Sequence, residues 1–147
     1  MGVRRKAREI ALQIIYSTDT NSQDVKDTLN MYWEQNPTEH EVVEFTNILV
    51  VGAIDNMAKI DELITKYTKN WNLSRMASVD RNILRVAIYE LVFYKETPVN
   101  VVINEAVELA KKFSTNESGG FVNGILDKVK EVRDEQDAQP SGDKKRD

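Results

Sequence analysis

The chain of 147 residues contains no cysteine and only one histidine. The lack of cysteine excludes disulfide scaffolds, thiolate metal sites and cysteine nucleophiles, and it is compatible with a reducing compartment. The histidine, His40, lies between Glu39 and Glu41 without a ligand pattern beside it, so we expect a solvated surface residue. Hydrolase and phosphate-loop motifs are also missing. The sequence therefore predicts a protein that is not an enzyme and needs no metal or cofactor.

Long apolar runs are absent as well. No stretch approaches the roughly 20 apolar residues that a membrane-spanning helix needs, and the basic start is not followed by a signal peptide. Gly2 does not open a myristoylation motif, because Lys6 occupies the position where serine or threonine is expected. We therefore expect a cytoplasmic protein without membrane contact, and the ordinary share of apolar residues, 41%, suits one globular domain.

Helical periodicity runs through nearly the whole chain. Apolar stripes at this spacing predict helices over roughly residues 3–18, 25–33, 38–67, 79–94, 98–113 and 122–132. Gly52, inside the longest of them, indicates close packing or a bend. A loop is expected at 116–120 because it contains two glycines. No segment has the period of a strand, so the sequence predicts an all-α fold of about six or seven helices.

The stripes also predict two lobes and a tail. A short link near residue 72 separates an N-terminal lobe of about 1–70 from a C-terminal lobe of about 71–133. Residues 134–147 contain almost nothing to bury, which predicts a disordered tail. The helix over 79–94 is apolar on nearly every side, as in a central buried helix. Its charged residues Arg85 and Glu90 are then expected to be paired.

One end of the chain is basic although the whole chain is acidic. Residues 1–9 contain four basic residues and one acidic residue, whereas the full chain has a net charge of −4. The basic residues are Arg4, Arg5, Lys6 and Arg8. Because arginine binds phosphate bidentately, the run indicates a polyanion held at one place. A solvated turn that only aids solubility explains the charge equally well.

An aromatic residue accompanies this basic run. Helical spacing places Tyr16 on the same flank as Arg5 and Arg8. Basic groups beside an aromatic ring suit single-stranded RNA, in which phosphates meet charge and bases stack. From the pattern alone, both Tyr16 and Phe121 also fit residues of the core or its edge.

Four stretches of the sequence resemble the NusB family of transcription antitermination factors. They are RRKARE at 4–9 followed by ALQ and Tyr16, VDR with ILRVAIYEL at 79–91, INEAVELAK at 103–111 and FVNGILD at 121–127. The stretches follow one another in the family's order and spacing. The resemblance implies an all-helical, two-lobed bundle without catalytic activity.

The same resemblance implies RNA and protein partners. Members of the family bind the boxA element of ribosomal RNA leader transcripts together with NusE, a small-subunit ribosomal protein, in an antitermination complex on RNA polymerase. RNA contact is then implied for Arg4, Arg5, Lys6, Arg8, Tyr16 and Phe121. Some members dimerise, so a homodimer stays open.

The sequence departs from the family beside Phe121. Gly120 stands where lysine is frequent, which removes a phosphate contact. Glu117 would repel phosphate and limit RNA affinity until a partner is present. We group it with Asp80 and Arg81, at the expected exposed start of helix 79–94, as residues that face NusE.

Two other interpretations remain. The first is a helical adaptor that binds proteins alone, without RNA specificity. The second is a fragment resembling the N-terminal domain of a ribosomal RNA cytosine methyltransferase, which would need a cofactor-binding α/β domain that this sequence lacks.

Overall fold

Helices account for nearly all of the residues that the structure describes. The computed structural model describes residues 2–20, 24–68 and 73–138, and no strand occurs within these ranges. The elements are α1 (Val3–Thr20), α2 (Val25–Gln35), α3 (His40–Asp55), α4 (Met57–Tyr67), the 3₁₀ turn η1 (Leu73–Arg75), α5 (Ser78–Ile88), the π-helical turn η2 (Tyr89–Tyr94), α6 (Val99–Phe113) and α7 (Asn116–Ala138). The predicted all-α fold is confirmed. No helix within the described ranges is long and apolar enough to cross a membrane.

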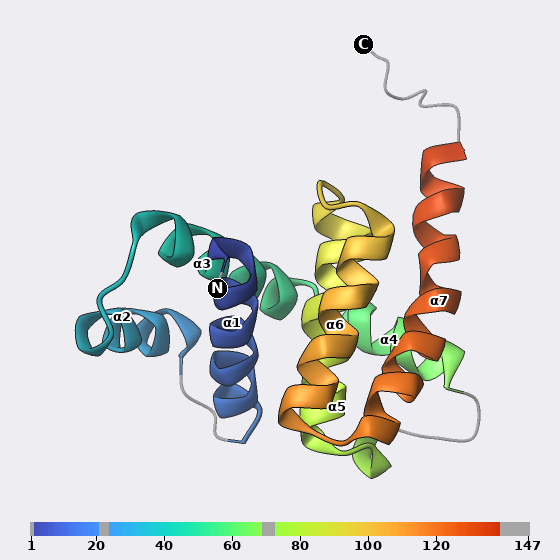
Figure 1. Cartoon of the computed structure of the whole chain (residues 1–147), viewed down its shortest axis with the longest axis horizontal. Helices are drawn as coiled ribbons and strands as arrows, with labels where there is room; N and C mark the ends of the chain where they lie inside the picture. Colours follow the sequence, from blue (N-terminus) through green and yellow to red (C-terminus); the bar gives the residue numbers. More distant parts are fainter. Residues whose placement is uncertain (1, 21–23, 69–72, 139–147) are drawn as a thin grey trace.

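The helices form a two-lobed bundle (Figure 1). Helices α1, α2 and α3 gather on one side, and α5, α6 and α7 gather on the other. Helix α4 packs against both α5 and α7, so it lies with the second group. The expected division between the lobes near residue 70 stays a prediction.

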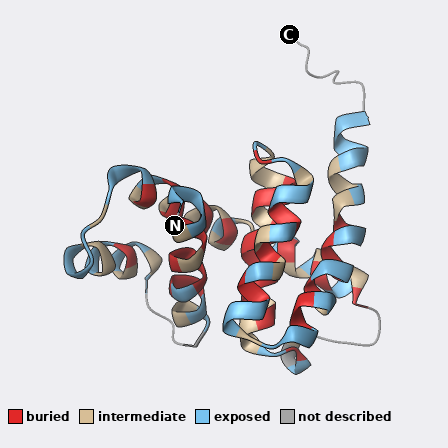
Figure 2. Cartoon of the chain, viewed as in Figure 1, coloured by how far each residue is buried: buried red, intermediate tan, exposed pale blue. Residues whose placement is uncertain are grey.

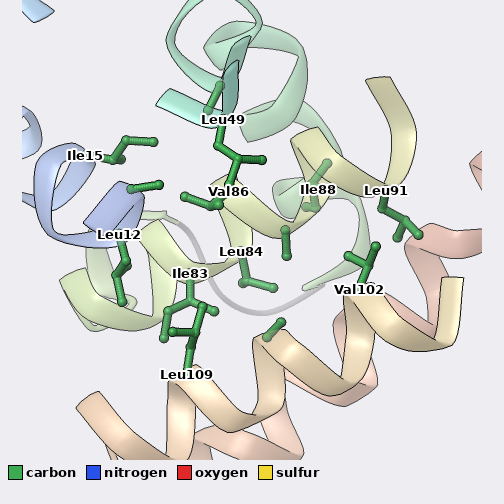
Figure 3. Close-up of a cluster of buried hydrophobic side chains, with 14 of the residues drawn as sticks. Leu12, Ile15, Leu49, Ile83, Leu84, Val86, Ile88, Leu91, Val102 and Leu109 are labelled. Carbon is green, nitrogen blue, oxygen red and sulfur yellow. The ribbon is translucent and has the colours of Figure 1, made fainter. Parts of the chain in front are cut away.

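The core is centred on α5, as its apolar sequence predicts. Every residue of this helix from Asn82 to Ile88 is buried. Figure 2 shows that the buried positions follow the inward faces of the helices. Figure 3 shows the side chains of α5 between those of α1 and α3 on one side and those of α6 on the other. Ile15, Leu49 and Ile83, which come from three different helices, are fully buried in this cluster. A single apolar core therefore joins the two lobes.

The single long helix predicted over 38–67 is wrong, because the chain breaks at Asn56. The Asn56 side-chain nitrogen donates to the carbonyl of Gly52 at 2.8 Å, and its backbone N–H donates to the same oxygen at 3.1 Å. Such a side-chain bond competes with the helical ladder. Gly52 itself marks close packing, since a Cβ there would overlap the ring of Tyr89.

A π-helical turn ends the segment predicted as one helix over 79–94. The turn closes at Lys95, whose backbone has a left-handed φ of 64° and whose N–H donates to the Glu90 carbonyl at 3.1 Å. The wider turn rotates the residues that follow it relative to α5.

Helix α7 is longer than the sequence predicts. It continues to Ala138, five residues into the segment expected to be disordered. Arg133 donates to the carbonyls of Thr97 at 2.8 Å and Lys95 at 3.2 Å, and Lys95 Nζ lies 2.9 Å from a carboxylate oxygen of Asp137. These contacts fix the last turns of the helix. The remainder of the expected tail, residues 139–147, lies outside the described residues.

Candidate nucleic-acid interface

The basic run forms the first two turns of α1, where an apolar face fixes its orientation. Ala7, Ala11 and Ile14 are buried against the core, which leaves the basic residues on the remaining flanks. Arg4 and Arg5 are exposed, Lys6 is half-buried and Arg8 is buried. The four residues that the sequence groups together therefore occupy three different environments.

Arg8 is held inside the protein by Glu90. Its Nε and Nη2 atoms donate to the two carboxylate oxygens at 2.8 and 2.6 Å, and the side chains are only 7% and 1% exposed. Thr97 Oγ1 also donates to this carboxylate, at 2.6 Å. Arg8 is therefore not a solvated cation, because its guanidinium neutralises a buried charge. The predicted pairing of Glu90 is confirmed.

Arg5 makes a similar contact at the surface. Its Nε and Nη2 atoms donate to the carboxylate of Glu105 at 3.0 and 2.6 Å, yet half of the Arg5 side chain is exposed. The hydrogen bond from Arg5 lowers the pKa of Glu105 below its usual range, so the pair stays ionised near neutral pH. A hollow of about 500 Å³ opens between the start of α1 and α6, and Arg4, Arg5 and Val101 line it.

Arg4 and Lys6 flank Arg5 on the surface. The guanidinium carbon of Arg4 lies 4.0 Å from the centroid of the Phe45 ring, and Nη1 donates to the Tyr94 hydroxyl at 3.3 Å. Lys6 Nζ donates to Thr38 Oγ1 at 2.9 Å. These contacts restrain the two side chains without burying them, so both can meet a phosphate.

Tyr16 is exposed, at 41%. It borders a groove between α1 and α2 together with Met31 and Tyr32. Eleven residues separate Tyr16 from Arg5, which corresponds to about 16 Å along the helix axis. The expectation of an aromatic on the flank of Arg5 is met, although the ring lies two to three turns away from the basic residues.

Phe121 lies in α7, and the loop predicted at 116–120 is wrong. The helix begins at Asn116, and the Ser118 N–H donates to Thr115 Oγ1 at 3.0 Å, which caps the first turn. Gly119 belongs to this turn and packs so closely on α6 that a Cβ would lie 3.3 Å from the side chain of Lys111. Phe121 is half-buried and packs against the core, while the neighbouring Gly120 faces open space.

The residues expected to face a protein partner differ in exposure. Asp80 is buried and accepts a hydrogen bond from Ser118 Oγ at 3.0 Å, so the expectation that it is exposed is wrong. Arg81 is half-buried and donates to the Leu73 carbonyl at 2.8 Å and to Asp19 at 2.7 Å. These two residues join α5 to neighbouring segments. Glu117 is exposed.

Asp19 is the centre of a charged network between the lobes. Burial alone would raise its pKa, but hydrogen bonds from Arg81, Asn82 and Arg85 lower it to about 2. Arg85 also donates to both carboxylate oxygens of Asp61 at 2.8 and 2.9 Å, which confirms the predicted pairing. The network connects the end of α1 to α4 and α5.

Sequence reasoning misses Glu105, Phe45 and Tyr94 as partners of the basic run. They come from α6, α3 and η2, and no spacing along the chain connects them to α1. Within the described part of the chain, no group of three or more histidine, cysteine or acidic side chains is arranged to hold a metal ion. The arrangement supplies restrained cations and partly exposed aromatic rings, which suit binding of an anionic polymer.

Comparisons with known proteins show a family likeness over most of the chain. The model of the NusB family matches residues 5–131. The chain is 48% identical over 129 residues to the transcription antitermination protein NusB of Trichlorobacter lovleyi, covering 88% of this chain and 91% of the relative.

Solved structures are similar as well. T. maritima NusB has a TM-score of 0.80 and 36% identity, covering 87% of this chain and 90% of that one. A structure of the antitermination factors NusB and NusE in complex with dsRNA has a TM-score of 0.82 and 28% identity, covering 90% and 98%. By sequence and by fold, the chain belongs to the NusB family.

Proposed function

We propose that the protein is an RNA-binding transcription antitermination factor. It binds single-stranded boxA-type RNA of ribosomal RNA leader transcripts together with NusE. It acts in the antitermination complex on RNA polymerase in the cytoplasm, where it promotes processive transcription of ribosomal RNA. Membership of the NusB family supports this class of function, since a relative of nearly equal length is named a transcription antitermination protein.

The exposed basic start of α1 is the observation that carries the proposal. Arg5 keeps half of its side chain exposed, and Arg4 and Lys6 lie beside it. We assign phosphate contacts to these three residues and base stacking to Tyr16 and Phe121. Accessible bases are needed for stacking, which favours a single strand over a duplex.

Arg8 takes a different part in the proposal. Its guanidinium could reach a phosphate only by leaving Glu90 buried and uncompensated, which is strongly unfavourable. We therefore assign Arg8 to the support of α1. Arg4, Arg5 and Lys6 remain as the cations that meet RNA directly.

NusE is the proposed protein partner. A solved relative is in complex with NusE and dsRNA, which supports NusE and RNA as partners of this protein. Glu117 is exposed near Phe121 and is our candidate for contact with NusE. Asp80 accepts a hydrogen bond from Ser118 in the same turn, and Arg81 bonds to Asp19 and to the Leu73 carbonyl. In a homodimer, a second copy of the chain placed over α1 would compete with RNA for the basic run.

Binding of a labelled boxA-like RNA tests the function. We expect the protein to bind this strand more tightly than a scrambled strand of equal length, and NusE to increase the difference. Fluorescence anisotropy at several salt concentrations measures both effects, because phosphate contacts make the affinity salt-dependent. Equal, weak binding of both strands with normal NusE binding would identify a protein-binding adaptor instead.

A further inference from the structure

Glu105 has no part in the function proposed above, although it contacts two of the arginines in the basic run. It comes from α6, and 100 residues separate it from Arg5. The Glu105 side chain is 17% exposed, and its carboxylate also lies 3.7 Å from Nη1 of Arg8. The carboxylate is therefore fixed in place by its helix and by a buried cation.

The contact between Glu105 and Arg5 uses one edge of the guanidinium. Nε and Nη2 donate to the two carboxylate oxygens. A planar guanidinium has a second edge, formed by Nη1 and Nη2, which matches a phosphate in the same bidentate way. Among the described residues, none accepts a hydrogen bond from Nη1 of Arg5.

The exposure of Arg5 agrees with a guanidinium that uses one edge and leaves the other edge open. Half of its side chain remains open to solvent while two of its nitrogens are bonded, and the adjoining hollow has room for a phosphate. An arginine side chain without a partner would sample many rotamers, and ordering it on binding costs conformational entropy. The bond to Glu105 removes part of that cost before RNA arrives.

We propose that Glu105 is a positioning residue for RNA binding, which holds Arg5 by one edge and presents the other edge to a backbone phosphate. The inference rests on the proposed function and assigns a role within it. Glu105 touches no RNA itself. Its negative charge opposes RNA in general, so the net benefit of Glu105 requires Arg5.

A double-mutant cycle with Arg5→Ala and Glu105→Gln tests the inference. The wild type, both single variants and the double variant are titrated with labelled single-stranded boxA-like RNA at several salt concentrations. We expect Glu105→Gln to weaken binding about threefold to tenfold, and Arg5→Ala to cost less in that background than in the wild type. The salt slope of Glu105→Gln should fall toward that of Arg5→Ala, since one phosphate contact is lost.

Glu108→Gln is the matched control. Glu108 lies one turn further along α6, is exposed and pairs with Lys111 at 3.8 Å. Its replacement removes the same charge from the same helix without touching the bond to Arg5, so affinity should stay equal or rise. If Glu105→Gln and Glu108→Gln raise affinity alike, Glu105 is only a repelling charge and the inference is overturned.

Glu105→Asp separates position from charge. It keeps the carboxylate but shortens its reach by one methylene, and we expect weaker RNA binding with an unchanged urea midpoint. Wild-type affinity for this variant would overturn the inference. An equal loss of affinity from Arg5→Ala in the wild-type and Glu105→Gln backgrounds would also overturn the inference, and it would leave the proposed function standing. Failure of the wild type to distinguish boxA-like from scrambled RNA would instead overturn the proposed function.

Discussion

Arg5 and Arg8 lie one turn apart on α1, and each donates to a glutamate through Nε and Nη2. The two pairs differ in environment, since the Arg8 side chain is 7% exposed and that of Arg5 is 51% exposed. A buried charge depends on its partner far more than a solvated charge does. The same contact therefore stabilises the fold at Arg8, whereas at Arg5 it restrains a cation that stays open to solvent.

The largest effect should come from the buried pair. Arg8→Ala leaves Glu90 without its partner, and breaking a buried ion pair costs about 3–5 kcal/mol of unfolding free energy. Urea unfolding followed by circular dichroism measures this loss. Replacing both partners, with Arg8→Met and Glu90→Leu, should recover most of the stability. A stable Arg8→Ala variant that has lost only RNA binding would remove the distinction between the two arginines.

Phe121 is half-buried, so its exposure is intermediate between that of Arg8 and that of Arg5. Stacking on a base is worth about 1–3 kcal/mol, so Phe121→Ala should weaken RNA binding about 5- to 150-fold. A fully buried phenylalanine would instead cost about 3–5 kcal/mol of stability. Measuring urea unfolding and RNA affinity on the same variant decides whether Phe121 stacks on a base or belongs to the core. Phe113→Ala, which removes an exposed ring at the end of α6, serves as the control.

The exposed pair should show its effect in binding alone. Arg5→Ala should leave the urea midpoint nearly unchanged, because the side chain is solvated. The salt slope of RNA binding should fall by about 0.7, the value for one phosphate contact on a single strand. The comparison with Arg8 fails if this variant unfolds as readily as Arg8→Ala.

The smallest effect should come from adding a cation that has no partner. Gly120 faces open space in the first turns of α7, so Gly120→Lys fits without a clash. It should raise RNA affinity severalfold and steepen the salt slope by about 0.7. Better helix propensity should also add about 0.5–1 kcal/mol of stability. Gly120→Gln should give the gain in stability without the steeper slope.

The helices were predictable because each carries an apolar stripe of period 3.6. The ends of the helices were less predictable where a single side chain determines the residue at which a helix begins or ends. The expected long helix breaks at Asn56, whose side chain bonds to the Gly52 carbonyl, and Thr115 caps a helix that starts within an expected loop. Both are local hydrogen bonds that an apolar pattern does not contain.

The candidate site was predictable in its charge and not in its pairing. The basic run is visible in the sequence, but Glu90 and Glu105 are 82 and 100 residues away from their arginines. Only the packing of α1, α6 and η2 around α5 brings them together. The sequence therefore identifies which residues are cations, and the tertiary structure determines which of them stay exposed.

The missing side chain at Gly52 sets how near the two lobes approach each other. Gly52 lies on α3 of the first lobe, and a Cβ there would overlap the ring of Tyr89 in the second. Any larger residue would have to displace this ring, so the close contact at Gly52 helps to hold η2 against α3. The same turn carries Glu90, so a glycine on α3 contributes to the position of the buried partner of Arg8.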